Sequence, residues 1–269
     1  MPLMDEFREE REQMKTQPLK KRLDYFWTYY KWWVIGGVAA VIVIISIVVN
    51  IVKSKEDLVY IAFVDTVENV GADTEKTIIT PFVESQGLNP KKNTLNLNLN
   101  FLFSGDGLSA DPASEGKPSY ANTTGYTSRE NLAIYIAAGD VDAICAPDAW
   151  FYNYAYSDFF IPLNEYMTDE EISSYGDRVC YVDKAVIDRY KKAHDEDNYD
   201  YYEEYPSMDD AADMEEPVAV GICVEDAPLY NQNYLTVDPD AKHIMIGIVR
   251  NTPNVSMSKD FIDFLSALN

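Results

Sequence analysis

One uninterrupted apolar run divides the chain. Residues 32–52 (WWVIGGVAAVIVIISIVVNIV) contain no charged side chain. A helix from Trp32 to Val52 would be about 31 Å long, close to the thickness of the hydrocarbon core of a bilayer. The pattern therefore predicts a transmembrane helix. A cleaved signal peptide is the alternative, and it is disfavoured because 31 residues precede the run and residues 54–56 contain no small-x-small cleavage site.

The basic residues around this run predict its orientation. Seven Lys and Arg residues precede it, whereas only Lys53 and Lys55 follow closely, so the N-terminus should be cytoplasmic. The aromatic flank YFWTYYKWW is typical of a headgroup anchor. We therefore expect a charged cytoplasmic arm (1–31), the bilayer as a partner, a short linker (53–57) and an extracytoplasmic domain (58–269).

Beyond the apolar run, strand and helix patterns alternate. We predict strands at 58–64, 95–101, 141–146, 217–224 and 243–249. Helical patterns lie between them, near 78–87, 127–138, 148–162 and 183–194, and the last helix contains Phe261, Phe264, Leu265 and Leu268. Strict alternation of Leu and Asn over 95–100 is typical of a strand with one solvated face, so we place it at a sheet edge. The predicted fold class is α/β, a three-layer αβα arrangement around a mixed sheet.

Local signals predict the helix ends and the loops. Thr127 with Glu130, and Thr168 with Glu171, have capping-box spacing. Asp148 is expected to cap the helix that follows it, and Ser256 or Ser258 the last helix. Two segments poor in aliphatic residues, 104–125 and 195–216, are expected to be long loops.

The charge is concentrated beyond the apolar run. The first 31 residues hold seven basic and six acidic side chains, which leaves 15 basic and 39 acidic side chains for the remainder, a net charge of −24. Such a surface repels nucleic acid and anionic lipid, so neither is an expected partner of the domain. Strong acidity of this kind is usually a solubility feature.

The three cysteines do not form a disulfide framework. Cys145 and Cys223 lie in apolar runs, where cysteine commonly packs as a small hydrophobic residue, and Cys180 is the third. One disulfide can form, but the spacing does not identify the pair.

Three segments together resemble a known family. NLAIYIAAGDVDAICAPDAWFYNYAYSDFFIPLNEYM is similar to extracellular, type 2 periplasmic solute-binding proteins, and so are ITPFVESQGL and IGIVRNTPNVSMSKDFIDFLSAL. The membrane-flanking YFWTYYKWW resembles that of small anchored proteins from Gram-positive anaerobes. Family members hold a ligand between two lobes. Here only residues 168–216 are left for a second lobe, which is too little for a core, so the resemblance implies one lobe, or one lobe with a flap.

A candidate ligand site lies at the carboxyl edge of the predicted sheet, where open α/β sheets bind ligands. Asp65, Ser104, Asp106, Asp148 and Trp150 follow strands and would form a shallow polar site with an aromatic wall, suited to a small polar solute or peptide. The alternative is that these carboxylates and serines only cap the following helices.

Catalytic and metal-binding motifs are absent from the sequence. His194 and His243 are the only histidines, and no nucleophile-elbow, zincin, phosphate-loop or CxxC pattern occurs. A calcium loop starting at Asp195 fails because Asp200 and Pro206 occupy its glycine and glutamate positions. We expect no enzyme, no cofactor and no metal.

Two functions fit this sequence. The first is a membrane-anchored, non-enzymatic solute-binding-like domain at the cell surface. The second is an interaction module that has lost ligand binding and docks on another membrane protein. An open pocket lined by the candidate residues would favour the first function, and their use in capping would favour the second.

Overall fold

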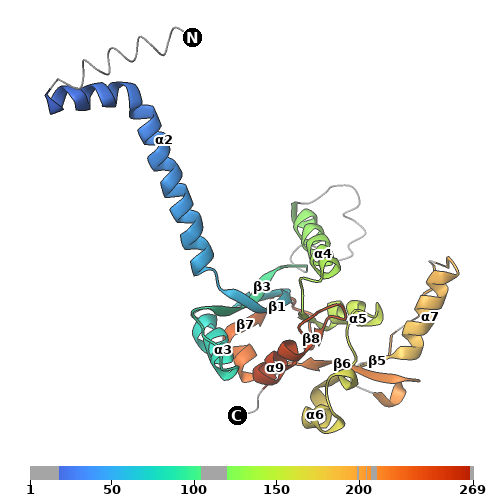
Figure 1. Cartoon of the computed structure of the whole chain (residues 1–269). Helices are drawn as coiled ribbons and strands as arrows, with labels where there is room; N and C mark the ends of the chain where they lie inside the picture. Colours follow the sequence, from blue (N-terminus) through green and yellow to red (C-terminus); the bar gives the residue numbers. More distant parts are fainter. Residues whose placement is uncertain (1–17, 104–119, 199, 204, 207–210, 267–269) are drawn as a thin grey trace. The chain divides into compact units, whose positions relative to one another are not determined.

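The computed structural model describes residues 18–103, 120–198, 200–203, 205–206 and 211–266, in two compact units, Met1–Ser54 and Lys55–Asn269. The described part of the first unit is dominated by one helix, α2 (Leu19–Lys53), which begins directly after Pro18 (Figure 1). Its segment Lys31–Val49 has a mean hydropathy of 2.7. It is the one helical segment among the described residues with the length and composition to cross a membrane, which is compatible with a single-pass anchor.

The second unit is built on a six-stranded mixed sheet, with strand order β3-β1-β4-β8-β6-β5. The strands are β1 (Glu56–Val64), β3 (Asn93–Phe101), β4 (Ala143–Pro147), β5 (Val179–Asp183), β6 (Pro217–Cys223) and β8 (Ile244–Ile248). β1 pairs in parallel with β3 and β4, whereas β8 is antiparallel to both β4 and β6, and β5 is antiparallel to β6. The predicted α/β class with a mixed sheet is confirmed.

β3 lies at one edge of the sheet, as its alternation predicts. Leu95 is buried at 4 % exposure, and Leu97 and Leu99 pack at the border of the same apolar core. On the other face of the strand, Asn98 Nδ2 donates a hydrogen bond of 2.6 Å to the hydroxyl of Tyr60. The amide side chains therefore cover a partly solvated face without burying unpaired polar groups.

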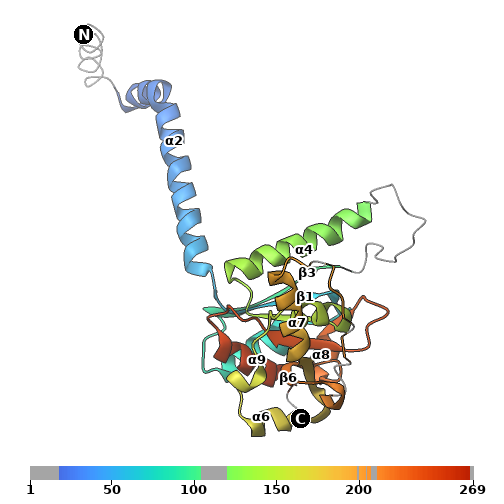
Figure 2. The ribbon, with the colours of Figure 1, turned by 90° about the vertical axis from the view of Figure 1, so that its right-hand side faces the viewer.

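Helices pack on both faces of the sheet (Figure 2). One core joins the sheet to α3 (Thr80–Ser85), which a π-helical turn precedes (Glu75–Ile79), to α8 (Pro228–Asn233) and to α9 (Val255–Ser266). The other core joins it to α4 (Tyr120–Ala138), α5 (Asp148–Tyr156) and α7 (Lys184–Asp195). The remaining elements are α6 (Asp169–Ser174), the short helices Leu163–Glu165, Gly176–Arg178 and Ala211–Asp213, and a ribbon of β2 (Thr66–Glu68) with β7 (Tyr234–Thr236).

Several predicted helix ends are confirmed. Thr168 and Glu171 form a complete capping box at the start of α6. Gly139 follows α4 with a φ of +75°, and Gly87 follows α3 with a φ of +69°, which is the left-handed geometry that glycine adopts most easily. Asp183 caps α7 by accepting a hydrogen bond of 3.0 Å from the backbone N–H of Ala185.

Other predicted boundaries are wrong. α4 already includes Tyr120, so the last six residues of the expected 104–125 loop are helical and Thr127 lies inside the helix. Residues 104–119 lie outside the described residues. The side chain of Asp148 does not cap α5, because Pro147 is the N-cap residue. Neither serine caps α9, because the helix begins at Val255 and both lie inside it; Ser258 Oγ donates a hydrogen bond to the carbonyl of Asn254, the residue before the helix.

The segment between the third and fourth predicted strands adds to the same sheet. Residues 168–216 supply α6, β5 and α7, and β5 was not predicted. Parts of the expected 195–216 loop pack on α7 and α5: Arg189 of α7 pairs with Glu203 at 2.8 Å, and Tyr205 stacks on Tyr156 of α5 with ring centroids 4.0 Å apart. The expected 53–57 linker is shorter, because α2 ends at Lys53 and β1 begins at Glu56.

Candidate functional site

Asp65, the first predicted ligand residue, follows β1 at the carboxyl edge of the sheet. Its side chain is fully buried, and its backbone has a left-handed φ of +49°. The carboxylate accepts a hydrogen bond of 2.5 Å from the backbone N–H of Phe103, and the carbonyl accepts one of 2.8 Å from Val237. Asp65 therefore joins the end of β3 to the β2–β7 ribbon.

Trp150, the predicted aromatic wall, is half-buried and packs against two neighbouring side chains. Its ring meets that of Phe103 edge-on with centroids 4.9 Å apart, and the Arg129 guanidinium lies 5.0 Å from the Trp150 ring centroid. Cation–π contact of this kind holds the indole within the fold. Through Phe103, the structure does bring Trp150 and Asp65 into one neighbourhood.

The remaining predicted residues are Asp148, Ser104 and Asp106, of which the structure describes Asp148. Asp148 is half-buried, and its backbone N–H donates a hydrogen bond of 3.0 Å to the carbonyl of His243. Ser104 and Asp106 lie outside the described residues. Among the pockets of the described part of the domain, three of about 230, 430 and 400 Å³ are lined by other residues.

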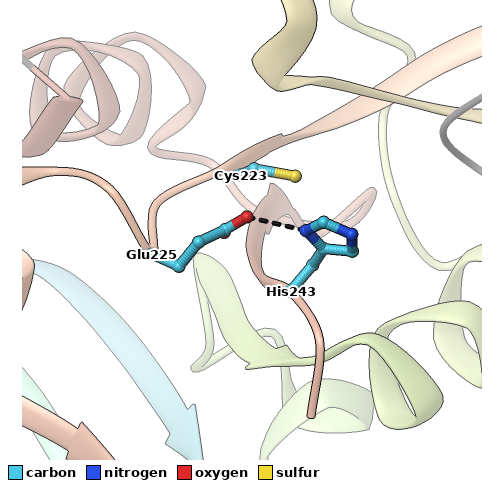
Figure 3. A group of neighbouring side chains, drawn as sticks. All are labelled: Cys223, Glu225 and His243. Atoms are coloured by element: carbon cyan, nitrogen blue, oxygen red, sulfur yellow. Dashed lines mark hydrogen bonds and ion pairs between the residues drawn. The ribbon is translucent and has the colours of Figure 1, made fainter.

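A group of three side chains that the sequence analysis did not identify lies at the same edge. Cys223 ends β6, Glu225 follows it by two residues, and His243 precedes β8 (Figure 3). The thiol, one carboxylate oxygen and one ring nitrogen all lie within 4.8 Å of one another. Thiolate, carboxylate and imidazole are common ligands of transition metals.

Glu225 holds this group together. One carboxylate oxygen lies 2.7 Å from Nδ1 of His243, and the other accepts a hydrogen bond of 3.2 Å from the backbone N–H of Ile244. The side chains of His243 and Glu225 are 33 % and 27 % exposed, so solvent reaches one side of the group. The group is therefore partly buried and accessible.

The other two cysteines lie near this edge. Cys180 Sγ is 3.1 Å from Cys223 Sγ, and no disulfide joins the two buried thiols, so the structure shows which two cysteines are close together but not a bonded pair. Cys145 in β4 is fully buried, and burial, with a further contribution from the negative charge of Glu225, raises the pKa of its thiol. Cys145 is therefore a neutral core residue rather than a reactive thiolate.

The pocket of about 230 Å³ combines an apolar floor with charged walls. Val182, Val218 and Val220 from β5 and β6 contribute to the floor. The walls carry three cations and three carboxylates, namely Lys184, Lys191, Arg250, Asp158, Glu165 and Asp188. Asp158 is the centre of this network, because Lys191 and Arg250 each approach its carboxylate at 2.6 Å.

Sequence reasoning missed the Cys223 group because no local motif marks it. Glu225 and His243 are 18 residues apart, and only the pairing of β6 with β8 brings them together. One signal was present: a histidine directly before a buried strand lies at a sheet edge, where residues from other strand ends can reach it.

Fold and site define an α/β domain that follows an N-terminal apolar helix and carries a cysteine, a glutamate and a histidine at the carboxyl edge of its sheet. Comparisons with protein-family models, with curated proteins and with solved structures found no match for this chain. Its function must therefore be argued from the chemistry of these side chains and of the surface.

Proposed function

We propose that the chain is a single-pass membrane protein whose acidic α/β domain lies outside the cytoplasm. In this proposal the domain is a non-enzymatic interaction module that docks on another membrane protein. We further propose that the domain is related to one lobe of the type 2 solute-binding proteins. The sequence segments that resemble that family and contribute to α4 and α9 support this relationship. Asp65 and Trp150 hold the fold together, which favours docking over binding of a solute by these residues.

The observation that carries this proposal is an apolar surface on the β2–β7 ribbon. Leu235 and Val237 are 57 % and 40 % exposed, and Leu235 pairs across the ribbon with the half-buried Val67. Cross-strand partners in an antiparallel ribbon share a face, and so do residues two apart in a strand. We call these three residues the ribbon patch.

Acidic residues flank the ribbon patch. Glu68 follows Val67 at the end of β2, where it is exposed on the opposite face of the ribbon, and the half-buried Asp238 follows Val237. An apolar centre with a charged rim is the usual anatomy of a protein interface. Because the whole domain carries a net charge of −24, the surface that fits it is an apolar site surrounded by Lys and Arg.

Photo-crosslinking tests the docking. A photoreactive amino acid at Leu235 of the full chain, in native membranes, should give an adduct with a second membrane protein. Higher salt should lower the yield because it screens the attraction of opposite charges. The matched control is Ile134 on α4, an apolar residue that is 64 % exposed. No adduct, adducts only between copies of this chain, or equal yields at both positions would contradict the proposal.

The membrane topology is tested separately. Protease added to intact cells should degrade the domain that follows α2, and deletion of residues 32–52 should release the chain from the membrane fraction. A domain that stays protected until the cells are lysed would reverse the proposed orientation. Such a result would leave the ribbon patch unaffected as a docking surface, so the two parts of the proposal fail independently.

A small polar solute is a second candidate partner, supported by the 230 Å³ pocket. In a strongly acidic domain, three of its cations meet there beside carboxylates, an arrangement that fits a zwitterion. Calorimetry of the full chain against amino acids, sugars and short peptides tests this function. Arg250→Gln should abolish any heat, whereas substitution of Arg178, outside the pocket, should not. A lack of heat from every class would exclude the tested solutes.

A further inference from the structure

We propose that Cys223, Glu225 and His243 form a binding site for a thiophilic divalent transition metal ion of the Zn²⁺ class. This inference does not depend on the docking function proposed above. It rests on three donor atoms of different chemical type that converge at one edge of the sheet (Figure 3).

The donor atoms already lie close to a coordinating arrangement. Sγ of Cys223, a carboxylate oxygen of Glu225 and a ring nitrogen of His243 are within 4.8 Å of one another. Ligands of Zn²⁺ lie roughly 2.0–2.3 Å from the ion, so neighbouring ligand atoms are about 3.3–3.8 Å apart in a tetrahedral site. Glu225 Oε1 and His243 Nδ1 are 2.7 Å apart as hydrogen-bond partners, so on metal binding these two atoms would separate slightly and the ion would replace their hydrogen bond.

The backbone holds the ligands in place. Cys223 pairs with Met245 across the ladder between β6 and β8, and the backbone N–H of Val224 donates a hydrogen bond of 2.8 Å to the carbonyl of Ile244. Ile244 in turn follows His243 and donates to the Glu225 carboxylate. Ligands carried by paired strand ends are positioned more rigidly than ligands on a loop, which lowers the cost of ordering them on binding.

The types of ligand indicate the class of metal. Calcium and magnesium take oxygen ligands, and this group offers only one carboxylate. Thiolate and imidazole select zinc and related transition metals. The net charge of −24 attracts cations to the domain, and the partial exposure of His243 and Glu225 gives an ion access. Cys180 Sγ, 3.1 Å from Cys223 Sγ, is close enough to supply a fourth ligand, and both thiols must be reduced for the site to form because a disulfide between them would remove the thiolate.

A simple ion pair between Glu225 and His243 is the competing explanation, and a thiol nucleophile assisted by histidine is another. In the first, Cys223 is an accidental neighbour and binds nothing. In the second, the thiol is reactive whether or not metal is present. A metal site differs from both because all three side chains must contribute to binding and because the ion must protect the thiol.

Metal titration of the full chain tests the site. The chain is purified in detergent without a histidine tag, treated with a chelator, kept reduced with a phosphine and titrated calorimetrically with Zn²⁺. Bound metal is counted by mass spectrometry. We expect one equivalent per chain, and Cys223→Ser, Glu225→Gln and His243→Gln should each weaken binding at least about tenfold. His194→Gln and Asp226→Asn are matched controls that should bind like the parent.

Two further readouts identify the ligands. Co²⁺ in place of Zn²⁺ should give a thiolate-to-metal charge-transfer band, and Cys223→Ser should abolish it while far-UV circular dichroism stays unchanged. Zn²⁺ should also slow alkylation of Cys223 by iodoacetamide at least tenfold. Substoichiometric Zn²⁺, binding that the three ligand variants leave unchanged, or alkylation that is equally fast with and without Zn²⁺ would overturn the proposal.

Discussion

Gly221 lies in β6. Among the described glycines, it is the one at which substitution by alanine should lower the free energy of unfolding most. A Cβ built there contacts Phe151 Cζ and lies 2.9 Å from the carbonyl oxygen of Ile246. The Phe151 ring cannot move away, because it stacks on Phe160 with ring centroids 4.5 Å apart. Phe160 itself lies against Gly247, where an added Cβ would be 2.9 Å from its ring. The methyl group of Gly221→Ala would therefore clash with aromatic rings that have no space to move into.

The expected cost follows from overpacking. A methyl group inserted into a well-packed core lowers the free energy of unfolding by about 1–3 kcal/mol. Because neither the Phe151 ring nor the carbonyl oxygen of Ile246 can move away, we expect Gly221→Ala to lower it by about 3 kcal/mol. Phe151→Leu removes the ring atom that clashes, so in that background the same substitution should cost only about 1 kcal/mol, the remainder that the carbonyl of Ile246 causes. The coupling energy between the two positions should thus be about 2 kcal/mol.

Urea unfolding of the four variants, followed by far-UV circular dichroism of the full chain in detergent, measures this cycle. Gly176→Ala is the control: no atom lies within 4 Å of its Cβ, but a φ of +57° costs alanine about 1 kcal/mol. That cost should be the same with Phe151 or Leu at position 151. A coupling energy near zero for Gly221, or a cost of Gly221→Ala no larger than that of Gly176→Ala, would refute the packing argument.

The remaining predictions concern acid stability, capping and the thiol pair. Burial alone would raise the pKa of Asp183, but backbone N–H groups of residues 215, 216 and 185 donate to its carboxylate and hold the pKa below its ordinary value of 3.8. A carboxyl group whose pKa is lower in the folded than in the unfolded protein stabilises the fold at pH values above its unfolded pKa. This stabilisation is lost as the pH falls through the folded pKa. Asp183→Asn should therefore be less stable than the parent at pH 7, and urea unfolding should show the difference shrinking below about pH 4; a constant difference would contradict this assignment. Thr168→Ala should cost about 1 kcal/mol through the lost N-cap of α6, and Thr168→Ser should not. Glutathione disulfide should oxidise Cys180 and Cys223 to one intramolecular disulfide, releasing two glutathione thiols, and mass spectrometry should find no such link in Cys180→Ser.

Most of the fold could be predicted because local periodicity reports burial directly. The Leu–Asn alternation of β3 identified an edge strand, and the apolar runs of β1 and β6 identified two further strands of the sheet. β5 (VCYVD) was missed because α7 begins directly after it, at Lys184, so its short apolar run was not separated from the helical pattern that follows. The start of α4 was missed because Gly125 and the small polar residues around it are typical of loops, although the helix includes them.

The site was predicted only as a region. The rule that ligands gather at carboxyl strand ends led us to expect Asp65 and Asp148 at the edge where the Cys223 group also lies. Which side chains are available there depends on contacts that no spacing encodes. The carboxylate of Asp65 already accepts a hydrogen bond from the backbone N–H of Phe103. His243 lies beside Glu225 only because β6 and β8 pair. Long-range register therefore decides the chemistry of this edge.

The junction between α2 and β1 has a consequence for how partners meet. Only two residues separate Lys53 from Glu56, a span of at most about 7 Å, and Lys55 of this pair is bound to Glu75 at 2.9 Å. With α2 inserted as proposed, the domain cannot leave the bilayer to search in solution. Encounters then depend on lateral diffusion and on the number of copies per unit of membrane area. The fraction of domains bound to a partner should rise with the number of partner molecules per unit of membrane area. Even a weak complex can then be formed most of the time where the partner is concentrated.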